Sequence, residues 1–190
     1  MKRVMHWLLL GVALVLCHSS VQASELSDRL STDRYVLLMR HALAPGVGDP
    51  PGYSLARCES QRILNDEGKR QAVRIGQWLR SQGIAQASVY TSAWCRCTQT
   101  AELLGFAPAV VESSLASFFD EPHLAAAQNK SLQTFIAQAL RTKKDRALIL
   151  VTHHVNILEF MGQNIGSGDM VLAHVNAQGR LLDYKRYPSP

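Results

Sequence analysis

The sequence predicts an α/β fold in which helices cover both faces of a mostly parallel β-sheet. Tyr35–Met39 and Ala147–Val151 are continuous apolar runs of strand length, a pattern typical of strands that are buried on both faces. Segments with helical periodicity lie between such runs, and this alternation indicates a three-layer αβα sandwich. The chain has 190 residues, of which 47% are hydrophobic and 18% charged. This composition fits one globular domain and excludes a disordered chain.

Helices and strands alternate through the first half of the chain, after a polar segment at residues 24–34. Asn65 is placed to cap the start of a helix, and Gly83 is placed to end it. Apolar side chains recur along this helix at helical spacing, namely Ala72, Ile75, Trp78 and Leu79. We expect a second strand at Ser88–Thr91 and a second helix at Thr98–Leu104.

The second half of the chain continues the same alternation. Ala109–Val111 is a third strand candidate, and Ser131 is placed to cap a helix with an apolar face made of Leu132, Phe135, Ile136, Ala139 and Leu140. A short helix is expected from about Asn156 to Met161, after the apolar strand. Met170–Val175 and Arg180–Tyr187 flank an Asn-Ala-Gln-Gly turn sequence, which predicts a terminal β-hairpin.

The N-terminus has the pattern of a secretory signal peptide. Lys2 and Arg3 precede the apolar stretches Trp7–Leu10 and Val12–Leu16, and small residues follow at positions 21–23. We therefore expect a signal peptide over residues 1–23 and a single domain over residues 24–190. The apolar stretch is short for a membrane span, so no stable membrane insertion is expected after cleavage. An uncleaved membrane anchor is the alternative interpretation.

Export predicts a periplasmic or secreted protein, in the envelope of a Gram-negative bacterium. Loss of Lys2 and Arg3 lowers the formal net charge from +5 to +3, which suits a local anion site. No dense Lys/Arg run or basic stretch interleaved with aromatics is present, so a nucleic-acid partner is not expected. The oligomeric state is not predicted.

Three cysteines remain after the signal peptide, at positions 58, 95 and 97. An odd number allows one disulfide and one free thiol in an oxidising compartment. Cys58 can pair with Cys95 or with Cys97, and the third cysteine is then expected to be a buried thiol. The one-residue spacing between Cys95 and Cys97 matches no zinc motif.

Arginine and histidine residues follow the predicted strands. Ligands of open α/β sheets bind beyond the carboxyl ends of the strands, where this chain has Arg40-His41, Ser92–Arg96 and Thr152–His154. Guanidinium groups match phosphate oxygens bidentately, and a neutral imidazole can act as a nucleophile. These residues therefore indicate phosphate chemistry. The Pro- and Gly-rich segment 44–53 is long for a loop, which suggests a binding role.

Four segments in the same order resemble the histidine phosphatase superfamily, which includes cofactor-dependent phosphoglycerate mutases. Arg40-His41 resembles its Arg-His-Gly signature, with Ala42 in place of Gly. Residues 64–72 are similar to its Leu-Thr-x-x-Gly-x-x-Gln-Ala helix start, and residues 92–101 to its Ser-x-x-x-Arg-x-x-x-Thr-Ala segment. Residues 151–153 resemble the strand that delivers its second histidine, although His154 follows where many relatives have Gly. The resemblance runs from Tyr35 to the end of the chain.

This resemblance implies a phosphoglycerate mutase-like fold and a metal-independent phosphomonoester hydrolase without a cofactor. His41 would be the nucleophile that becomes phosphohistidine, and Arg40, Arg96 and His153 would hold the phosphoryl oxygens. The expected substrate is a small phosphorylated molecule, such as an envelope or periplasmic phosphoester. The alternative is a non-catalytic module of the same fold that binds phosphate or anionic glycans. A mutase is disfavoured because export separates the protein from glycolytic intermediates.

The superfamily also uses a general acid, usually a carboxylate between the second arginine and the second histidine. Glu112, Asp120 and Glu121 lie in this interval. The pair Phe118-Phe119 would desolvate its neighbours and raise a carboxyl pKa, which favours Asp120 or Glu121, and a solvated loop charge is the alternative for each. Arg62 is a further candidate for substrate binding, although a solvated basic residue explains it equally well.

Histidines could instead bind a metal ion, since His41, His153 and His154 are expected at the same edge of the sheet. No carboxylate stands in a recognisable ligand spacing with them, and two nearby arginines would repel a cation. The sequence therefore favours a site without metal.

Overall fold

A mixed six-stranded sheet forms the centre of the computed structural model, which describes residues 24–106 and 108–190. The strand order is β3-β2-β4-β1-β5-β6. The strands are β1 (Tyr35–Arg40), β2 (Ala87–Thr91), β3 (Val110–Val111), β4 (Ala147–Thr152), β5 (Met170–Val175) and β6 (Leu181–Tyr187). The first four are mutually parallel, while β5 and β6 run antiparallel as the expected hairpin. The predicted signal peptide lies outside the described residues.

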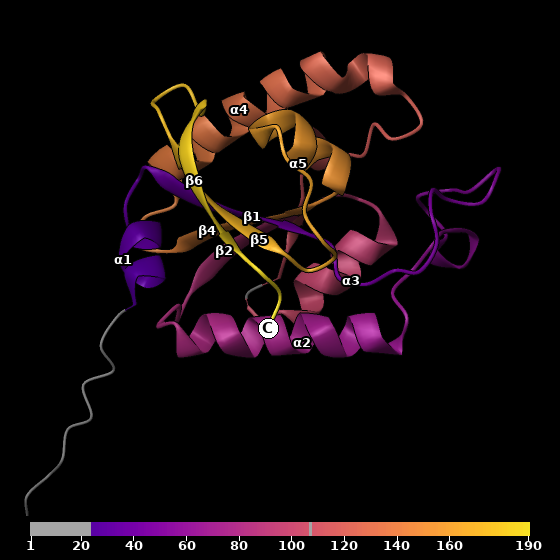
Figure 1. Cartoon of the computed structure of the whole chain (residues 1–190), viewed down its shortest axis with the longest axis horizontal. Coiled ribbons are helices and arrows are strands. Elements are labelled where there is room, and N and C mark those ends of the chain that lie inside the picture. Colours follow the sequence, from indigo (N-terminus) through magenta and orange to yellow (C-terminus); the bar gives the residue numbers. More distant parts are fainter. Residues whose placement is uncertain (1–23, 107) are drawn as a thin grey trace, which may run out of the picture.

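Helices cover both faces of the sheet, as Figure 1 shows. The helices are α1 (Glu25–Ser31), α2 (Asp66–Ser81), α3 (Cys95–Leu103), α4 (Ala125–Thr142) and α5 (His154–Met161). The right-handed rule for crossovers between parallel strands explains which face each helix covers. From β1 the chain passes through α2 and α3 toward the β3 edge of the sheet, and it returns to β4 through α4 on the opposite face. This confirms the predicted three-layer α/β fold. In the described part of the chain, no helix combines the length and the hydropathy that crossing a membrane requires.

Strand β1 shows how the sheet separates two hydrophobic cores. Leu37 and Met39 pack with the apolar side chains of α1, α2 and α3, whereas Val36 and Leu38 pack with those of α4 and α5. All four side chains are fully buried. Successive side chains of a strand point to opposite faces, so a continuous apolar run is what a sheet covered on both sides needs.

One helix, α1, was not predicted from the sequence, and another, α4, begins earlier than predicted. The polar segment 24–34 contains α1, because Leu26 and Leu30 lie one turn apart and both are buried. Ser131 as an N-cap was wrong: α4 begins at Ala125, and the Ser131 hydroxyl donates to the Ala127 carbonyl inside the helix (3.1 Å). Three consecutive alanines have high helix propensity, and they extend α4 toward the N-terminus.

The starts of α3 and α5 also differ from the prediction. Helix α3 begins at Cys95 instead of Thr98, and the Cys95 amide donates to the Gln61 side chain (2.9 Å). Because the capping residue lies 34 residues earlier in the sequence, the residues around Cys95 contain no N-cap pattern that would predict this helix start. Helix α5 begins at His154, directly after β4, instead of at Asn156.

The parallel strands end together at one edge of the sheet. In the register of these strands Arg40 lies opposite Thr152, and Thr91 lies opposite Val151. The amide of His41 donates to the Thr152 carbonyl (3.0 Å), which continues the ladder past the end of β1. The residues that follow the three strands therefore meet at the edge where a ligand is expected.

Candidate active site

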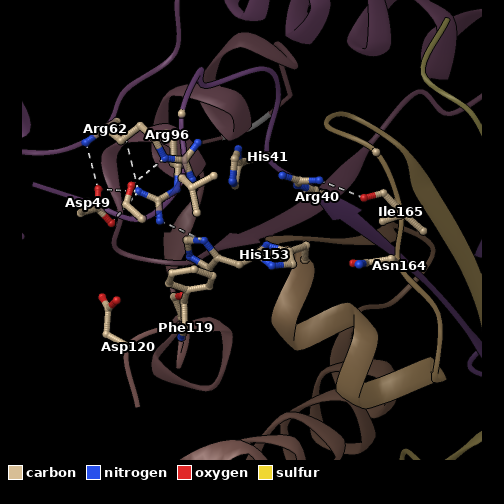
Figure 2. A pocket seen from close by; sticks show the side chains of 16 residues that line it. Arg40, His41, Asp49, Arg62, Arg96, Phe119, Asp120, His153, Asn164 and Ile165 are labelled. Atoms are coloured by element: carbon tan, nitrogen blue, oxygen red, sulfur yellow. Dashed lines mark hydrogen bonds and ion pairs between the residues drawn. The ribbon is translucent and has the colours of Figure 1, made fainter. Parts of the chain in front are cut away.

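A cavity of about 390 Å³ opens at this carboxyl edge (Figure 2). Its walls include most of the predicted site residues, namely Arg40, His41, Arg62, Arg96, Asp120 and His153. Other lining residues come from the loop at 46–49, from Ser117 and Phe119, from His154, and from the segment 164–166. Glu121 is exposed and does not line the cavity.

His41 is held in one tautomer by its own backbone neighbour. Its Nδ1 lies 2.8 Å from the Ala42 carbonyl oxygen, which can only accept a hydrogen bond, so Nδ1 carries the proton and Nε2 keeps a lone pair. Burial lowers the pKa of His41 to about 3, and the positive charges of Arg96 and Arg40 act in the same direction. The imidazole is therefore neutral at ordinary pH.

Residues of the two sequence motifs at 64–72 and 92–101 hold the loop that follows His41. The Thr100 hydroxyl accepts the Ala42 amide (3.0 Å), and the Gln71 side chain accepts the Leu43 amide (2.8 Å). A Cβ at Gly68 would lie 2.0 Å from the Leu43 carbonyl oxygen, so only glycine allows α2 to pack this closely. These contacts explain physically why the motifs occur together, because each fixes the backbone beside His41.

Arg40 and Arg96 bring two guanidinium groups to the cavity beside His41 (Figure 2). Arg40 donates from Nη1 to the Ile165 carbonyl (3.0 Å), and burial lowers its pKa. Arg96 lies in the first turn of α3 and is almost fully buried. Among residues 24–106 and 108–190, the Nε atoms of both arginines are buried without a hydrogen-bond partner. Unsatisfied buried donors are costly, and they are suited to an anionic ligand.

Asp49 is a site residue that the sequence analysis missed. Both of its carboxylate oxygens accept from Arg96 Nη1 (2.9 and 3.0 Å), in an ion pair whose side chains are 3% and 4% exposed. The same carboxylate accepts from Trp94 Nε1 (3.1 Å) and from the Arg62 amide (2.9 Å). One signal was available, because Asp49 is the only charged residue of the segment 44–53.

Arg62 holds the loop that carries Asp49. It donates from Nε to the Gly48 carbonyl (2.8 Å) and from Nη1 to the Ala44 carbonyl, and its side chain lines the cavity. Gly46 and Gly48 have φ values of +93° and +67°, a conformation that favours glycine, and these turns aim the loop carbonyls at Arg62. The position of Arg62 fits an anchor of the loop, and its predicted contact with substrate stays a prediction.

The disulfide joins Cys58 to Cys95, which settles the alternative left open by the sequence. It ties the long loop after β1 to the first residue of α3, next to Arg96. Cys97 is the free, buried thiol, and its Sγ lies 3.5 Å from His153 Nε2. Burial raises the pKa of the Cys97 thiol to about 12, so it remains protonated and unreactive.

His153 forms the wall of the cavity opposite His41. Its Nε2 lies 2.8 Å from the Ser92 hydroxyl and its Nδ1 lies 3.4 Å from Arg96 Nη2, while the two histidine rings meet edge to face at 5.6 Å. Burial, reinforced by His41 and Arg96, lowers the pKa of His153 well below its usual value. In the described part of the chain, no three His, Cys, Asp or Glu side chains are grouped so as to hold a metal ion.

Of the three candidate acids, Asp120 alone lines the cavity. The Glu112 carboxylate accepts the Ser114 amide (2.9 Å) and caps a short helical turn instead. The expected desolvation by Phe118-Phe119 was wrong, because Phe118 turns into the protein and both Asp120 and Glu121 are exposed. His154, whose side chain the sequence left unplaced, lines the cavity beside Phe119.

Comparison with known families agrees with this geometry. A model of the histidine phosphatase superfamily (branch 1) matches residues 36–147, which is more than half of the chain. The chain belongs to the histidine phosphatase superfamily. This membership supports a phosphatase function. No curated protein matches the sequence significantly.

Solved structures share the fold at low sequence identity. The chain is similar to YhfR of Bacillus stearothermophilus (TM-score 0.57, 15% identity, covering 78% of this chain and 94% of that one). It also resembles the mycobacterial glucosyl-3-phosphoglycerate phosphatase (TM-score 0.55, 14% identity, 80% and 96% covered). The protein histidine phosphatase SixA complexed with tungstate gives a TM-score of 0.51 at 18% identity, with 80% and 94% covered. At these identities the likeness concerns the fold.

Removal of the Asp49 carboxylate should destabilise the protein. In Asp49→Ala, Arg96 becomes a buried cation without its partner, which costs on the order of 3 kcal/mol of unfolding free energy. Urea denaturation measures this loss. Asp183→Ala, which removes an exposed partner of His174, is the matched control and should have a much smaller effect. Equal losses in the two variants would contradict the role of the buried pair.

The low pKa of His41 should make stability depend on pH. The unfolded chain binds a proton at His41 near pH 6.5, whereas the folded protein binds it only near pH 3, so this stability is present above pH 6.5 and is lost as the pH falls. His41→Gln should remove about 2 kcal/mol of the stability difference between pH 7 and pH 5. Urea denaturation of both proteins at the two pH values tests this, and an unchanged difference in the variant would refute the assignment.

Proposed function

We propose that the protein hydrolyses small phosphate monoesters without a metal ion, through a phosphohistidine intermediate at His41. The observation that carries the proposal is a neutral, buried imidazole whose Nε2 lone pair is free, in a cavity also lined by Arg40 and Arg96. A nucleophile must be unprotonated, and a phosphoryl group needs positive charge around its oxygens. This site supplies an unprotonated nucleophile and two positive charges, so no base is needed to remove a proton from the nucleophile.

In the proposed first step, Nε2 of His41 attacks phosphorus, and an N–P bond forms as the bond to the ester oxygen breaks. Arg40 and Arg96 stabilise the charge on the oxygens of the transferring group, and His153 completes the pocket around it. Asp120 is the group proposed to donate a proton to the departing alkoxide. In the second step the Asp120 carboxylate takes a proton from water, the water oxygen attacks phosphorus, and the N–P electron pair returns to His41.

The substrate proposed is a small phosphoester of the bacterial envelope or periplasm. The cavity volume of about 390 Å³ is in the range of small-molecule sites. The signal peptide expected at residues 1–23 would export the protein to a compartment that also suits the Cys58–Cys95 disulfide. A tungstate complex of one protein with the same fold supports oxyanion binding at this fold.

Hydrolysis of an aryl phosphate tests the proposed reaction. The protein should be active with a chelator present, and His41→Ala should abolish turnover, whereas His174→Ala, a histidine on β5 that does not line the cavity, should leave it unchanged. Loss of activity on chelation would refute the metal-independent mechanism. An inactive wild-type protein that still binds orthophosphate would favour the non-catalytic binding module.

Paired carboxamide variants distinguish the two candidate acids. Asp120→Asn should lower kcat by about 100-fold on an alkyl phosphate, because a poor leaving group depends on protonation. The loss should be smaller on an aryl phosphate, whose leaving group needs less protonation. Glu121→Gln is the matched control and should have little effect on either substrate. A larger loss in Glu121→Gln would transfer the acid role to Glu121.

A further inference from the structure

The two halves of the Cys58–Cys95 disulfide differ in their exposure to solvent. Cys58 is exposed and begins the short helical turn η1 (Cys58–Ser60), whereas Cys95 is 4% exposed and is the first residue of α3. Thiol–disulfide exchange begins when a thiolate attacks one of the two sulfurs, and access decides which sulfur is attacked. An incoming thiol therefore reaches Cys58, and the sulfur that leaves is that of Cys95.

The position of Cys95 favours its role as the leaving group. Helix α3 has nine residues, and Cys95 stands at its N-terminal end, where the helix dipole places partial positive charge. Such a position stabilises a cysteine thiolate, and exchange is faster when the departing thiolate is more stable. The disulfide is therefore suited to opening from the Cys58 side.

The free thiol of Cys97 does not face this disulfide. Its Sγ lies 3.5 Å from His153 Nε2 and 3.8 Å from the Thr152 carbonyl oxygen, so the side chain points toward the end of β4. Residues two apart on a helix do not share a face, and Cys95 points to the loop that carries Cys58. Both thiols that open and release the bond must therefore come from another molecule.

The turn that carries Cys58 depends on the disulfide for its place on α3. Within the part of the chain that the structure describes, the hydrogen bonds of residues 54–60 are all made inside the segment 54–61. The neighbouring Gln61 side chain accepts the Cys95 amide (2.9 Å). After reduction, this one hydrogen bond is the polar link that remains between the turn and the start of α3.

The same loop carries the partner of Arg96. The Arg62 amide donates to the Asp49 carboxylate (2.9 Å), which also accepts from Trp94 Nε1 (3.1 Å) and from Arg96 Nη1 (2.9 and 3.0 Å). The consecutive residues 94–96 are thus all tied to the segment 49–62. Because Asp49 compensates the buried charge of Arg96, loosening of this segment alters a guanidinium group that lines the cavity.

We propose that the Cys58–Cys95 disulfide is a site of reversible reduction by a dithiol, and that its reduction weakens phosphate binding in the cavity. The second half of this proposal rests on the proposed function, in which Arg96 binds the phosphoryl oxygens. Tight packing of α3 against the loop in the oxidised form holds Arg96 in place. The reduced form keeps the fold and loses this fixation.

The exchange balances as a two-electron transfer. One thiolate of the dithiol attacks Cys58 Sγ, and the electron pair of the S–S bond leaves on Cys95 Sγ, which takes a proton. The second thiol of the dithiol, as thiolate, attacks the dithiol's own sulfur in the mixed disulfide and expels the Cys58 thiolate, which also takes a proton. The dithiol is oxidised to a disulfide, and the protein gains two thiols.

Dithiothreitol, used without denaturant, tests both halves of the proposal. Alkylation and mass spectrometry should then find label on Cys58 and Cys95 and none on the buried Cys97. The Kd of orthophosphate, measured by calorimetry, should rise about tenfold on reduction, within the usual range of coupling between two sites, and should return on reoxidation. By linkage, saturating orthophosphate should make the disulfide harder to reduce by the same factor.

Two cysteine variants and hydrogen exchange complete the test. Cys58→Ser should bind orthophosphate as weakly as the reduced protein and should not respond to dithiothreitol. Cys97→Ser is the matched control and should respond as the wild-type protein does. Reduction should also speed amide hydrogen exchange over residues 44–62, a readout that needs no phosphate.

Three outcomes separate the exchange site from the proposed function. A bond that opens only in denaturant would overturn the exchange site, and an unchanged Kd of orthophosphate in the reduced protein would overturn its effect on the cavity. If neither form binds orthophosphate while reduction still speeds exchange over residues 44–62, the phosphate function is refuted and the exchange site is supported.

Discussion

The buried ion pair between Asp49 and Arg96 is the constraint on which the cavity depends. Arg96 stands in the first turn of α3, where the fold buries it almost completely, and a buried guanidinium without a partner would be strongly destabilising. The loop after β1 must therefore fold back across α3 to bring Asp49 to it. The Cys58–Cys95 disulfide and the Gln61 bond to the Cys95 amide fix the same loop to the same helix end. One wall of the cavity is thus held at three separate points.

Burial of the histidines is tied to this positive environment. Burial is the largest cause of the low pKa of both His41 and His153, and the charge of Arg96 lowers both further. Burial and the charges that would attract a phosphate therefore act together to keep both imidazoles unprotonated before it binds. The cost falls on stability at acid pH, because the folded protein cannot accept protons that the unfolded chain binds.

The sequence allowed prediction of the parts of the site that follow regular strands. Arg40, His41 and His153 come directly at or after strand ends, and the parallel register brings those ends together whatever the loops do. Arg96 follows a short connection from β2, so its place was also predictable. Asp49 and the pairing of Cys58 depend instead on how a long loop folds onto α3, which no periodicity encodes. The predicted start of α3 was wrong because the amide of its first residue, Cys95, is capped by Gln61 from the same long loop.

Phe119 illustrates the second limit of prediction from sequence. Two consecutive phenylalanines suggested a desolvated carboxylate. The side chains of Thr152 and Asn156 instead bond to the backbone just before this pair, in a segment where Phe118 is buried and Phe119 is exposed. The charged groups of the cavity come from regular elements and from loops alike. Arg40, His41, Arg96 and His153 stand at strand ends or in the first turn of α3, whereas Asp49 and Asp120 stand in the loops at 46–49 and 117–120. The strand pattern predicts the first group, and the second depends on how the loops fold back over the sheet edge.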